Sequence, residues 1–113
     1  MRICIIGGGL TSLALAKALV NQNIYVDILT DKKKQIINQS RTIGITKSNI
    51  EYFNNNIINI DRVSWKLNKI EIFSDKLNQK KLLEFQNEHQ ELFSMVRSFD
   101  IYNILEKSLK RNK

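Results

Sequence analysis

The fold is decided by residues 2–12, which read RICIIGGGLTS. The first part of this stretch, Arg2–Ile6, is a short continuous apolar run of the kind that forms a buried strand. Three glycines follow it, and residues 10–21 then consist mainly of helix formers. This order of strand, glycine turn and helix predicts the opening βα unit of a nucleotide-binding α/β fold.

The glycine turn and the start of the helix carry the candidate binding residues. Gly7 allows the tight turn, and Gly9 lets the backbone come close to a pyrophosphate. The exposed amides of the first helical turn, at Leu10, Thr11 and Ser12, complement the negative charge together with the helix dipole. Ser12 stands where the fingerprint usually has Gly or Ala, and a slight shift of the helix accommodates its hydroxymethyl group. We therefore predict a dinucleotide here, and the alternative is a glycine turn that binds nothing.

The same fingerprint expects an acid at the end of the second strand, about 20 residues beyond the glycines, where it holds the ribose hydroxyls. We predict this strand at residues 24–29, so Thr30 occupies the place of the acid and Asp31 follows it. Asp31 serves if the strand runs one residue longer. The rival interpretation is NADP, because lysines 32–34 would pair with its additional phosphate. Against it, Asp31 would crowd that phosphate, and such lysines are typical of a solvated loop.

The rest of the chain alternates between helical and strand patterns. The first predicted elements are a short helix or loop at 32–38 and a helix at 48–53, which Thr46 or Ser48 caps and the asparagines at 54–56 stop. Hairpin strands at 69–73 and 81–85, a third strand at 92–96 and an amphipathic helix at 99–110 follow. The fold class that follows is α/β, with a parallel sheet begun by the first two strands and an antiparallel hairpin.

Length and composition narrow the class of protein. A chain of 113 residues with 42% hydrophobic and 26% charged residues has room for one core and is expected to fold. No apolar run is long enough to cross a bilayer, and no secretory signal precedes the first strand, so the expected location is the cytoplasm. The lone Cys4 forms no internal disulfide and is expected to be a small buried apolar residue.

The sequence favours neither a nucleic-acid site nor a metal site. The net charge of +7 comes from lysines scattered along the chain, without the alternating aromatic residues of a single-strand groove, so nucleic acid is not the expected partner. His89 has no second His or Cys in helical register, and we expect it to be a loop residue and not a metal ligand. The metal set is therefore predicted to be empty.

Beyond the glycines, the sequence resembles the FAD-dependent hydroxylases of the p-hydroxybenzoate hydroxylase class, most closely those that hydroxylate polyprenyl aromatic rings in ubiquinone biosynthesis. The segments that carry the resemblance, in the family's order, are 7–19, then 40–46 with Ser48 and Phe53, and finally 70–75, 83–85 and 92–109. The resemblance covers essentially the whole chain and implies a Rossmann-like FAD-binding domain of the p-hydroxybenzoate hydroxylase type.

The resemblance also implies roles for two arginines. The family's second segment contains an arginine that contacts the flavin cofactor, and Arg41 matches it; a fixed guanidinium can bond pyrophosphate oxygens in a forked geometry. Arg97 resembles an arginine found after the corresponding strand in several aromatic hydroxylases. In the ubiquinone branch that place is more often acidic and followed by Asn, whereas this chain has Arg97 and Ser98.

Members of this family are much longer than 113 residues, and their second FAD motif and most of their substrate-binding sheet lie beyond the matched part. We therefore expect residues 1–113 to be a truncated, partial FAD-binding domain, with a second chain as the candidate source of the rest. The complete enzyme would take electrons from NAD(P)H and hydroxylate an aromatic ring. The alternatives are a non-catalytic remnant and a fragment of an NADP-binding oxidoreductase.

Overall fold

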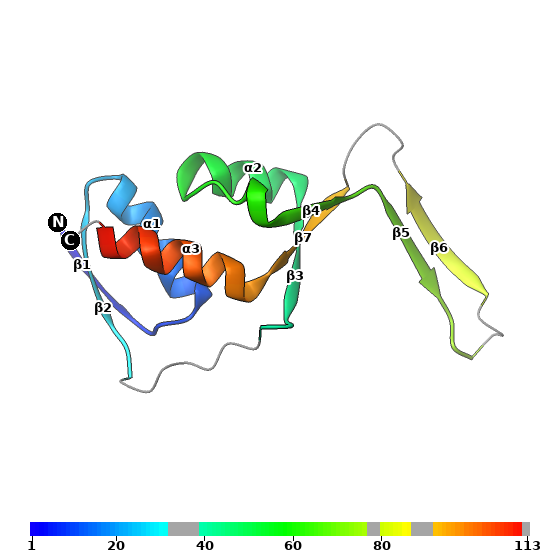
Figure 1. Cartoon of the computed structure of the whole chain (residues 1–113), viewed down its shortest axis with the longest axis horizontal. Coiled ribbons are helices and arrows are strands. Elements are labelled where there is room, and N and C mark those ends of the chain that lie inside the picture. Colours follow the sequence, from blue (N-terminus) through cyan, green and yellow to red (C-terminus); the bar gives the residue numbers. More distant parts are fainter. Residues whose placement is uncertain (32–38, 77–79, 87–91, 112–113) are drawn as a thin grey trace.

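The chain opens with a parallel βαβ unit, as the sequence predicts. The computed structural model describes residues 1–31, 39–76, 80–86 and 92–111; the segment 32–38 and His89 lie outside them. Strand β1 (Arg2–Ile6), helix α1 (Leu10–Asn21) and strand β2 (Tyr25–Leu29) follow one another, and β1 pairs with β2 in parallel from Arg2 opposite Tyr25 to Ile6 opposite Leu29 (Figure 1). The predicted boundaries of the first three elements are confirmed to within one residue.

Helix α1 covers one face of this two-stranded sheet. Ile5 on β1 is buried on that face, and Leu13 and Ala16 are the buried residues of the helix. The side chains of Cys4 and Ile6 alternate to the opposite face, where both are exposed. The prediction that Cys4 is buried is therefore wrong, because no described element covers this second face of β1 and β2. We call it the open face of the β1–β2 sheet.

A second, antiparallel sheet forms the middle of the molecule. It consists of β3 (Thr42–Thr46), β7 (Phe93–Arg97) and β4 (Ser64–Leu67), in the spatial order β3, β7, β4. The strand predicted at 92–96 is confirmed as β7. The sequence analysis missed β3 and β4, since each is short and joins the sheet only by pairing with β7, far away in the sequence.

Helix α2 (Lys47–Asn56) follows β3 directly, and the short 3-10 helix η1 (Asp61–Val63) precedes β4. Thr46 caps α2, because its hydroxyl accepts a hydrogen bond from the Asn49 amide at 3.4 Å. The helix is longer than predicted and includes the asparagine run. Asn54 then holds the turn that follows, since its side-chain oxygen accepts from the Ile60 amide at 2.9 Å and its nitrogen donates to Asp61 at 2.9 Å.

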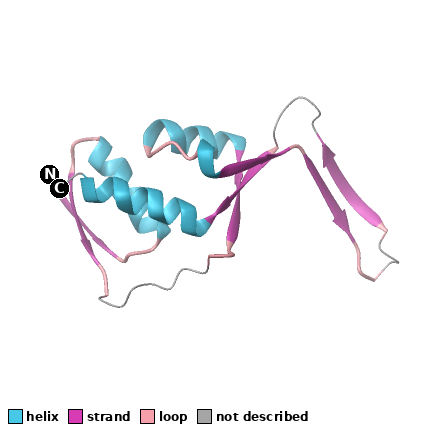
Figure 2. Ribbon diagram, in the orientation of Figure 1, coloured by secondary structure: helices cyan, strands magenta, loops and turns pink. Residues whose placement is uncertain are grey.

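Helix α3 (Ser98–Arg111) begins where β7 ends and packs along α1. Its apolar positions Ile101 and Leu105 are buried, so the predicted amphipathic helix is confirmed. One core cluster joins helices α1, α2 and α3 to the antiparallel sheet. Its buried members are Leu13, Ile50, Ile60, Val96, Ile101 and Leu105. Figure 2 shows the helices close to one another, with the β1–β2 sheet to one side and strands β3, β4 and β7 to the other.

The Ser98 hydroxyl has no hydrogen-bond partner among the described residues. Ser98, the first residue of α3, has a side chain that is 3% exposed. Its backbone amide is satisfied, because it donates to the Arg41 carbonyl at 2.9 Å. A buried hydroxyl without a partner lowers the stability of a fold.

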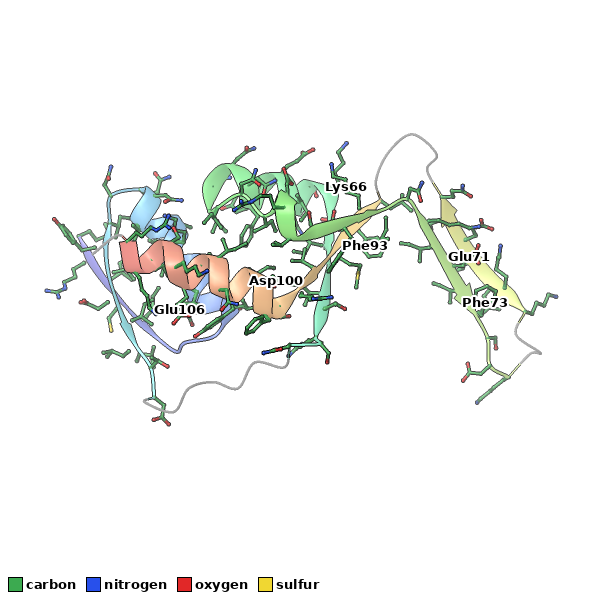
Figure 3. All side chains as sticks on the ribbon, viewed as in Figure 1. Lys66, Glu71, Phe73, Phe93, Asp100 and Glu106 are labelled. Carbon is green, nitrogen blue, oxygen red and sulfur yellow. The ribbon has the colours of Figure 1, made fainter. Side chains whose placement is uncertain are left out.

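The predicted hairpin is confirmed as β5 (Lys69–Phe73) and β6 (Lys81–Gln86), which are antiparallel with an irregularity next to Phe73. It projects from the rest of the molecule (Figure 1). The radius of gyration is 17.5 Å, whereas a compact domain of this size has about 13 Å. Figure 3 shows Glu71 and Phe73 on the hairpin, away from α3, which carries Asp100 and Glu106.

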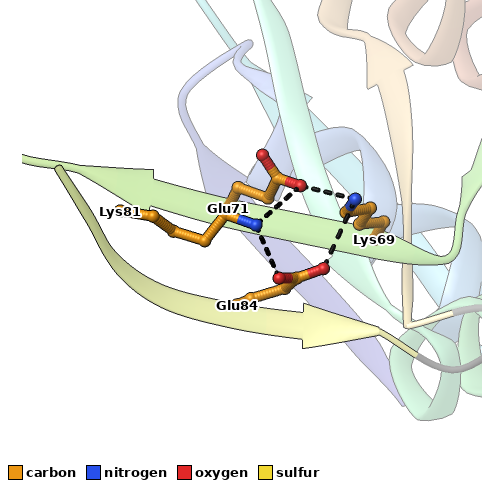
Figure 4. A network of polar contacts seen from close by, with 4 residues as sticks. All are labelled: Lys69, Glu71, Lys81 and Glu84. Atoms are coloured by element: carbon orange, nitrogen blue, oxygen red, sulfur yellow. Dashed lines mark hydrogen bonds and ion pairs between the residues drawn. The ribbon is translucent and has the colours of Figure 1, made fainter. Parts of the chain in front are cut away.

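The two faces of the hairpin differ in chemistry. One carries a quartet of charges, in which Lys69 contacts Glu71 at 2.5 Å and Glu84 at 3.3 Å, while Lys81 contacts Glu84 at 2.7 Å and Glu71 at 3.5 Å (Figure 4). The two glutamates lie directly opposite each other in the register, an arrangement that alone would be unfavourable. The lysines compensate this repulsion.

The opposite face of the hairpin is apolar and is built from two cross-strand pairs. Ile70 lies opposite Phe85, and Ile72 lies opposite Leu83. Ile72, Leu83 and Phe85 are each between 43% and 53% exposed. An isolated two-stranded hairpin is marginally stable in water, and exposed ion pairs contribute little.

None of the described helices is long and apolar enough to span a membrane.

The charge quartet predicts a stability that depends on pH. The hydrogen bond from Lys69 lowers the pKa of Glu71, and that from Lys81 lowers the pKa of Glu84, while the same contacts raise the pKa of both lysines. Stabilisation is thus present above the ordinary pKa of glutamate and is lost as pH falls through the lowered values; it is also lost as pH rises through the raised lysine values.

We expect amide hydrogen exchange in β5 and β6 to be slowest at neutral pH, after correction for the intrinsic exchange rate, and to lose protection as the pH falls below the ordinary pKa of glutamate. The double substitution Glu71→Gln and Glu84→Gln should remove this acid dependence. Glu106→Gln, which breaks an ion pair with Lys110 on α3, is the matched control and should leave it unchanged. Equal acid dependence in all three proteins would contradict the role of the quartet.

The unpaired hydroxyl of Ser98 gives a second expectation. Ser98→Ala should raise the free energy of unfolding by about 1 kcal/mol, because it removes a buried group without a partner. Ser64→Ala is the control: its hydroxyl donates to the Asp61 carbonyl at 3.1 Å, so its loss should lower stability. Denaturant titrations of both variants decide the point, and a destabilised Ser98→Ala protein would show that the hydroxyl has a partner in solution.

Candidate nucleotide site at the glycine turn

The glycine turn is tied to the end of β2 by a backbone hydrogen bond. The Gly7 amide donates to the Leu29 carbonyl at 2.8 Å. Gly7 has a φ of 126°, a backbone conformation that side chains other than hydrogen strongly disfavour. A Cβ at Gly7 would also lie 3.1 Å from the Ser12 hydroxyl, which rests against the turn. The chain accommodates serine at the third position of the fingerprint in this way.

Gly9 leaves the approach to the helix open. A Cβ built on Gly9 would meet no described atom within 4 Å, and the residue is extended. Helix α1 starts immediately after it, with the Leu13 amide donating to the Gly9 carbonyl at 3.1 Å and no side-chain cap among the described residues. The amides of residues 10–12 therefore have no partner within the helix and can donate to an anion.

The end of β2 places Thr30 beside this turn. The strand ends at Leu29, so it does not extend far enough to bring Asp31 into the position of the expected acid. A Cβ on the buried Gly8 would lie 2.5 Å from the Thr30 hydroxyl oxygen and 3.1 Å from its Cβ, so Thr30 packs directly on the glycine backbone. Asp31 is exposed one position further along, and its role in ribose binding stays a prediction.

The two predicted arginines are brought together by the antiparallel sheet. Arg97, the last residue of β7, lies opposite Thr42, and the carbonyl of Arg41 accepts from the amide of Ser98. Both arginines are exposed. The guanidinium of Arg97 lies 5.3 Å from the ring centroid of Trp65 on β4, a cation–π contact that orients it. The sequence analysis did not identify Trp65, because an isolated Trp gives no sign of its neighbours.

The arrangement of helices relates these arginines to the glycine turn. Helices α1 and α3 pack side by side and run in the same general direction, so that their first turns lie at the same end of the pair (Figure 1). The glycine turn precedes α1, and Arg97 precedes α3. Donors and cations from two distant parts of the sequence are thus placed on one side of the molecule. Such a set suits a ligand with a central pyrophosphate.

The residues present also limit the chemistry. The described part of the chain holds no group of His, Cys, Asp and Glu side chains that could bind a metal ion. The turn offers backbone donors and a hydroxyl from Thr30, and Arg41 and Arg97 lie at the start of α3. These groups can bind and orient an anionic nucleotide.

Comparison with known proteins gives matches in structure and none in sequence. No protein-family model matches the chain, and a search of curated proteins finds no match. Among solved structures, 2,6-dihydroxypyridine-3-hydroxylase from Arthrobacter nicotinovorans superimposes with a TM-score of 0.70 at 17% identity, over 95% of this chain and 26% of that enzyme. HpxO from Klebsiella pneumoniae, solved in complex with FAD and uric acid, gives 0.72 at 15% identity over 99% of this chain and 29% of HpxO.

A third match, assigned as an FAD-containing monooxygenase from Photorhabdus luminescens, has a TM-score of 0.71 at 17% identity and covers 99% of this chain. The chain spans less than a third of the length of each of these structures. The fold expected from the sequence is confirmed: the chain has the α/β fold of the FAD-binding part of flavin-dependent monooxygenases of the p-hydroxybenzoate hydroxylase type, with a parallel βαβ start and antiparallel strands after it.

Proposed function

We propose that this chain binds FAD as the amino-terminal part of a flavin-dependent monooxygenase that hydroxylates an aromatic ring. The observation that carries the proposal is the glycine turn, in which the positive φ of Gly7 and the open approach at Gly9 leave room for a pyrophosphate at the start of α1. The same fold occurs in a protein that was solved with FAD bound.

The residues present fit the pyrophosphate of FAD. A Cβ at Gly9 would occupy the open approach, so glycine there keeps the amides of residues 10–12 accessible. Arg41 and Arg97 are exposed at the start of α3 and would bond the phosphate oxygens through their forked guanidinium groups. When bound, the flavin supplies the redox chemistry, with NAD(P)H as the external reductant. The chain itself binds the cofactor and orients it.

For the substrate, we propose an aromatic ring that carries a polyprenyl chain, as in ubiquinone biosynthesis. The support is the sequence resemblance in segments 40–46, 70–75 and 92–109. These segments form or border β3, β5, β7 and α3.

We further propose that additional polypeptide, from a second chain or a longer form of the protein, completes the enzyme. Large hydrophobic side chains that remain exposed are Met1, Ile6, Leu15, Tyr25, Leu29, Tyr52, Trp65, Ile72, Phe73, Leu82, Leu83 and Phe85. Most of them lie on the open face of the β1–β2 sheet or on the hairpin. Parallel sheets are normally covered on both faces, and a hairpin needs a covering partner for stability.

Fluorescence quenching of FAD by residues 1–113 tests the cofactor proposal. We expect saturable binding of FAD, and weaker binding of NAD and NADP as measured by competition. Gly9→Val should weaken FAD binding at least tenfold, a change of about 1.4 kcal/mol, because its branched side chain blocks the approach. The extended backbone of Gly9 accepts valine, and no described atom lies where the new Cβ would be, so the variant should fold.

Leu15→Val is the matched control, since Leu15 lies on the exposed side of the same helix and should leave FAD affinity unchanged. Circular dichroism establishes that both variants fold. Unchanged affinity in the Gly9→Val protein would remove Gly9 from the site. No binding by a folded wild-type sample would favour the non-catalytic remnant, and tighter binding of NADP than of FAD would favour the NADP-binding fragment.

A further inference from the structure

Thr30 lies at the end of β2, packed on the glycine turn. The bond from the Gly7 amide to the Leu29 carbonyl holds the end of β2 against the glycine turn, and Thr30 is the next residue. Its hydroxyl oxygen lies where a Cβ on Gly8 would be only 2.5 Å away. Thr30 is therefore held beside the turn by packing, at the place where the dinucleotide fingerprint has an acid.

The replacement of an acid by threonine changes what this place can bind. A carboxylate accepts hydrogen bonds from the ribose hydroxyls and repels a phosphate on the 2′ oxygen. A threonine hydroxyl is neutral and can both donate and accept. It can accept a bond from a free ribose hydroxyl, and it can equally donate one to a phosphate oxygen.

Charge also bears on whether a 2′-phosphate can bind beside Thr30. Asp27, three residues earlier on β2, is held by Arg2 through contacts of 2.6 and 3.2 Å, and the hydrogen bond from Arg2 lowers its pKa. Its charge is therefore compensated. Asp31 is exposed and lies one residue beyond the position that packs on Gly8. The chain as a whole carries a net charge of +7, which favours an additional phosphate.

We infer that Thr30 is a specificity-determining residue that makes the adenosine end of this site indifferent to a 2′-phosphate. The site then takes adenine nucleotides of both classes, with a free or a phosphorylated 2′ oxygen. The inference rests on the proposed nucleotide site at the glycine turn. It adds that the ribose contact does not favour FAD over 2′-phosphorylated nucleotides. Preference for FAD then comes from contacts with the flavin half of the cofactor.

Two small probes that differ only in the 2′-phosphate isolate this contact from the rest of the cofactor. We expect residues 1–113 to bind AMP and adenosine 2′,5′-bisphosphate with dissociation constants within about threefold of each other by isothermal titration calorimetry. Thr30→Glu should shift the ratio at least tenfold in favour of AMP, because the carboxylate bonds the ribose hydroxyls and repels the 2′-phosphate. Thr30→Ser keeps the hydroxyl and should keep the ratio near one.

Glu106→Gln, which removes a carboxylate on α3, is the matched control and should leave the ratio unchanged. Asp31→Asn tests the competing assignment of the ribose contact to the carboxylate next to Thr30. It should leave the ratio within about threefold of the wild-type ratio. The inference is overturned if the wild-type chain prefers AMP by more than about threefold, or if Asp31→Asn and not Thr30→Glu changes the ratio. FAD binding measured on the same sample separates the two proposals. A chain that binds FAD and rejects the bisphosphate removes only this inference. A folded chain that binds neither FAD nor either of the two probes removes the proposed function as well.

Discussion

The hydrogen bond from the Gly7 amide to the Leu29 carbonyl is the contact on which the candidate site depends. It joins the turn after β1 to the end of β2, so the direction in which the chain leaves β1 is fixed by the neighbouring strand. Only glycine readily takes the φ of 126° that this turn requires. Two consequences follow: Gly9 comes to the start of α1 with open space beside it, and Thr30 comes to rest on Gly8.

The packing of α1 on α3 has a comparable role for the rest of the site. The two helices share a core that includes Leu13, Ile101 and Leu105, and this core extends to Val96 on β7. Because the helices begin at the same end, the end of β7 is brought to the side of the glycine turn (Figure 1). Arg41 and Arg97 owe their position to this core and to the pairing of β3 with β7.

Local patterns in the sequence were enough to predict β1, α1, β2, the hairpin, β7 and α3, because each has its own periodicity or turn residues. Strands β3 and β4 were missed, since they become strands only through pairing with β7. The error at Cys4 has a related cause: burial of a strand residue depends on what covers the sheet. The arginines came from a resemblance alone, and the contacts of Thr30, Trp65 and Ser98 depend on residues distant in sequence.

The residues of the candidate site lie apart from the apolar surfaces that remain uncovered. The glycine turn, Thr30 and the start of α1 rest on the buried core, whereas the uncovered apolar surface lies on the far face of the β1–β2 sheet and on the projecting hairpin. The hairpin makes its contacts mainly within itself, so its stability has little influence on the turn. The candidate nucleotide site can therefore be ordered while these apolar surfaces remain uncovered.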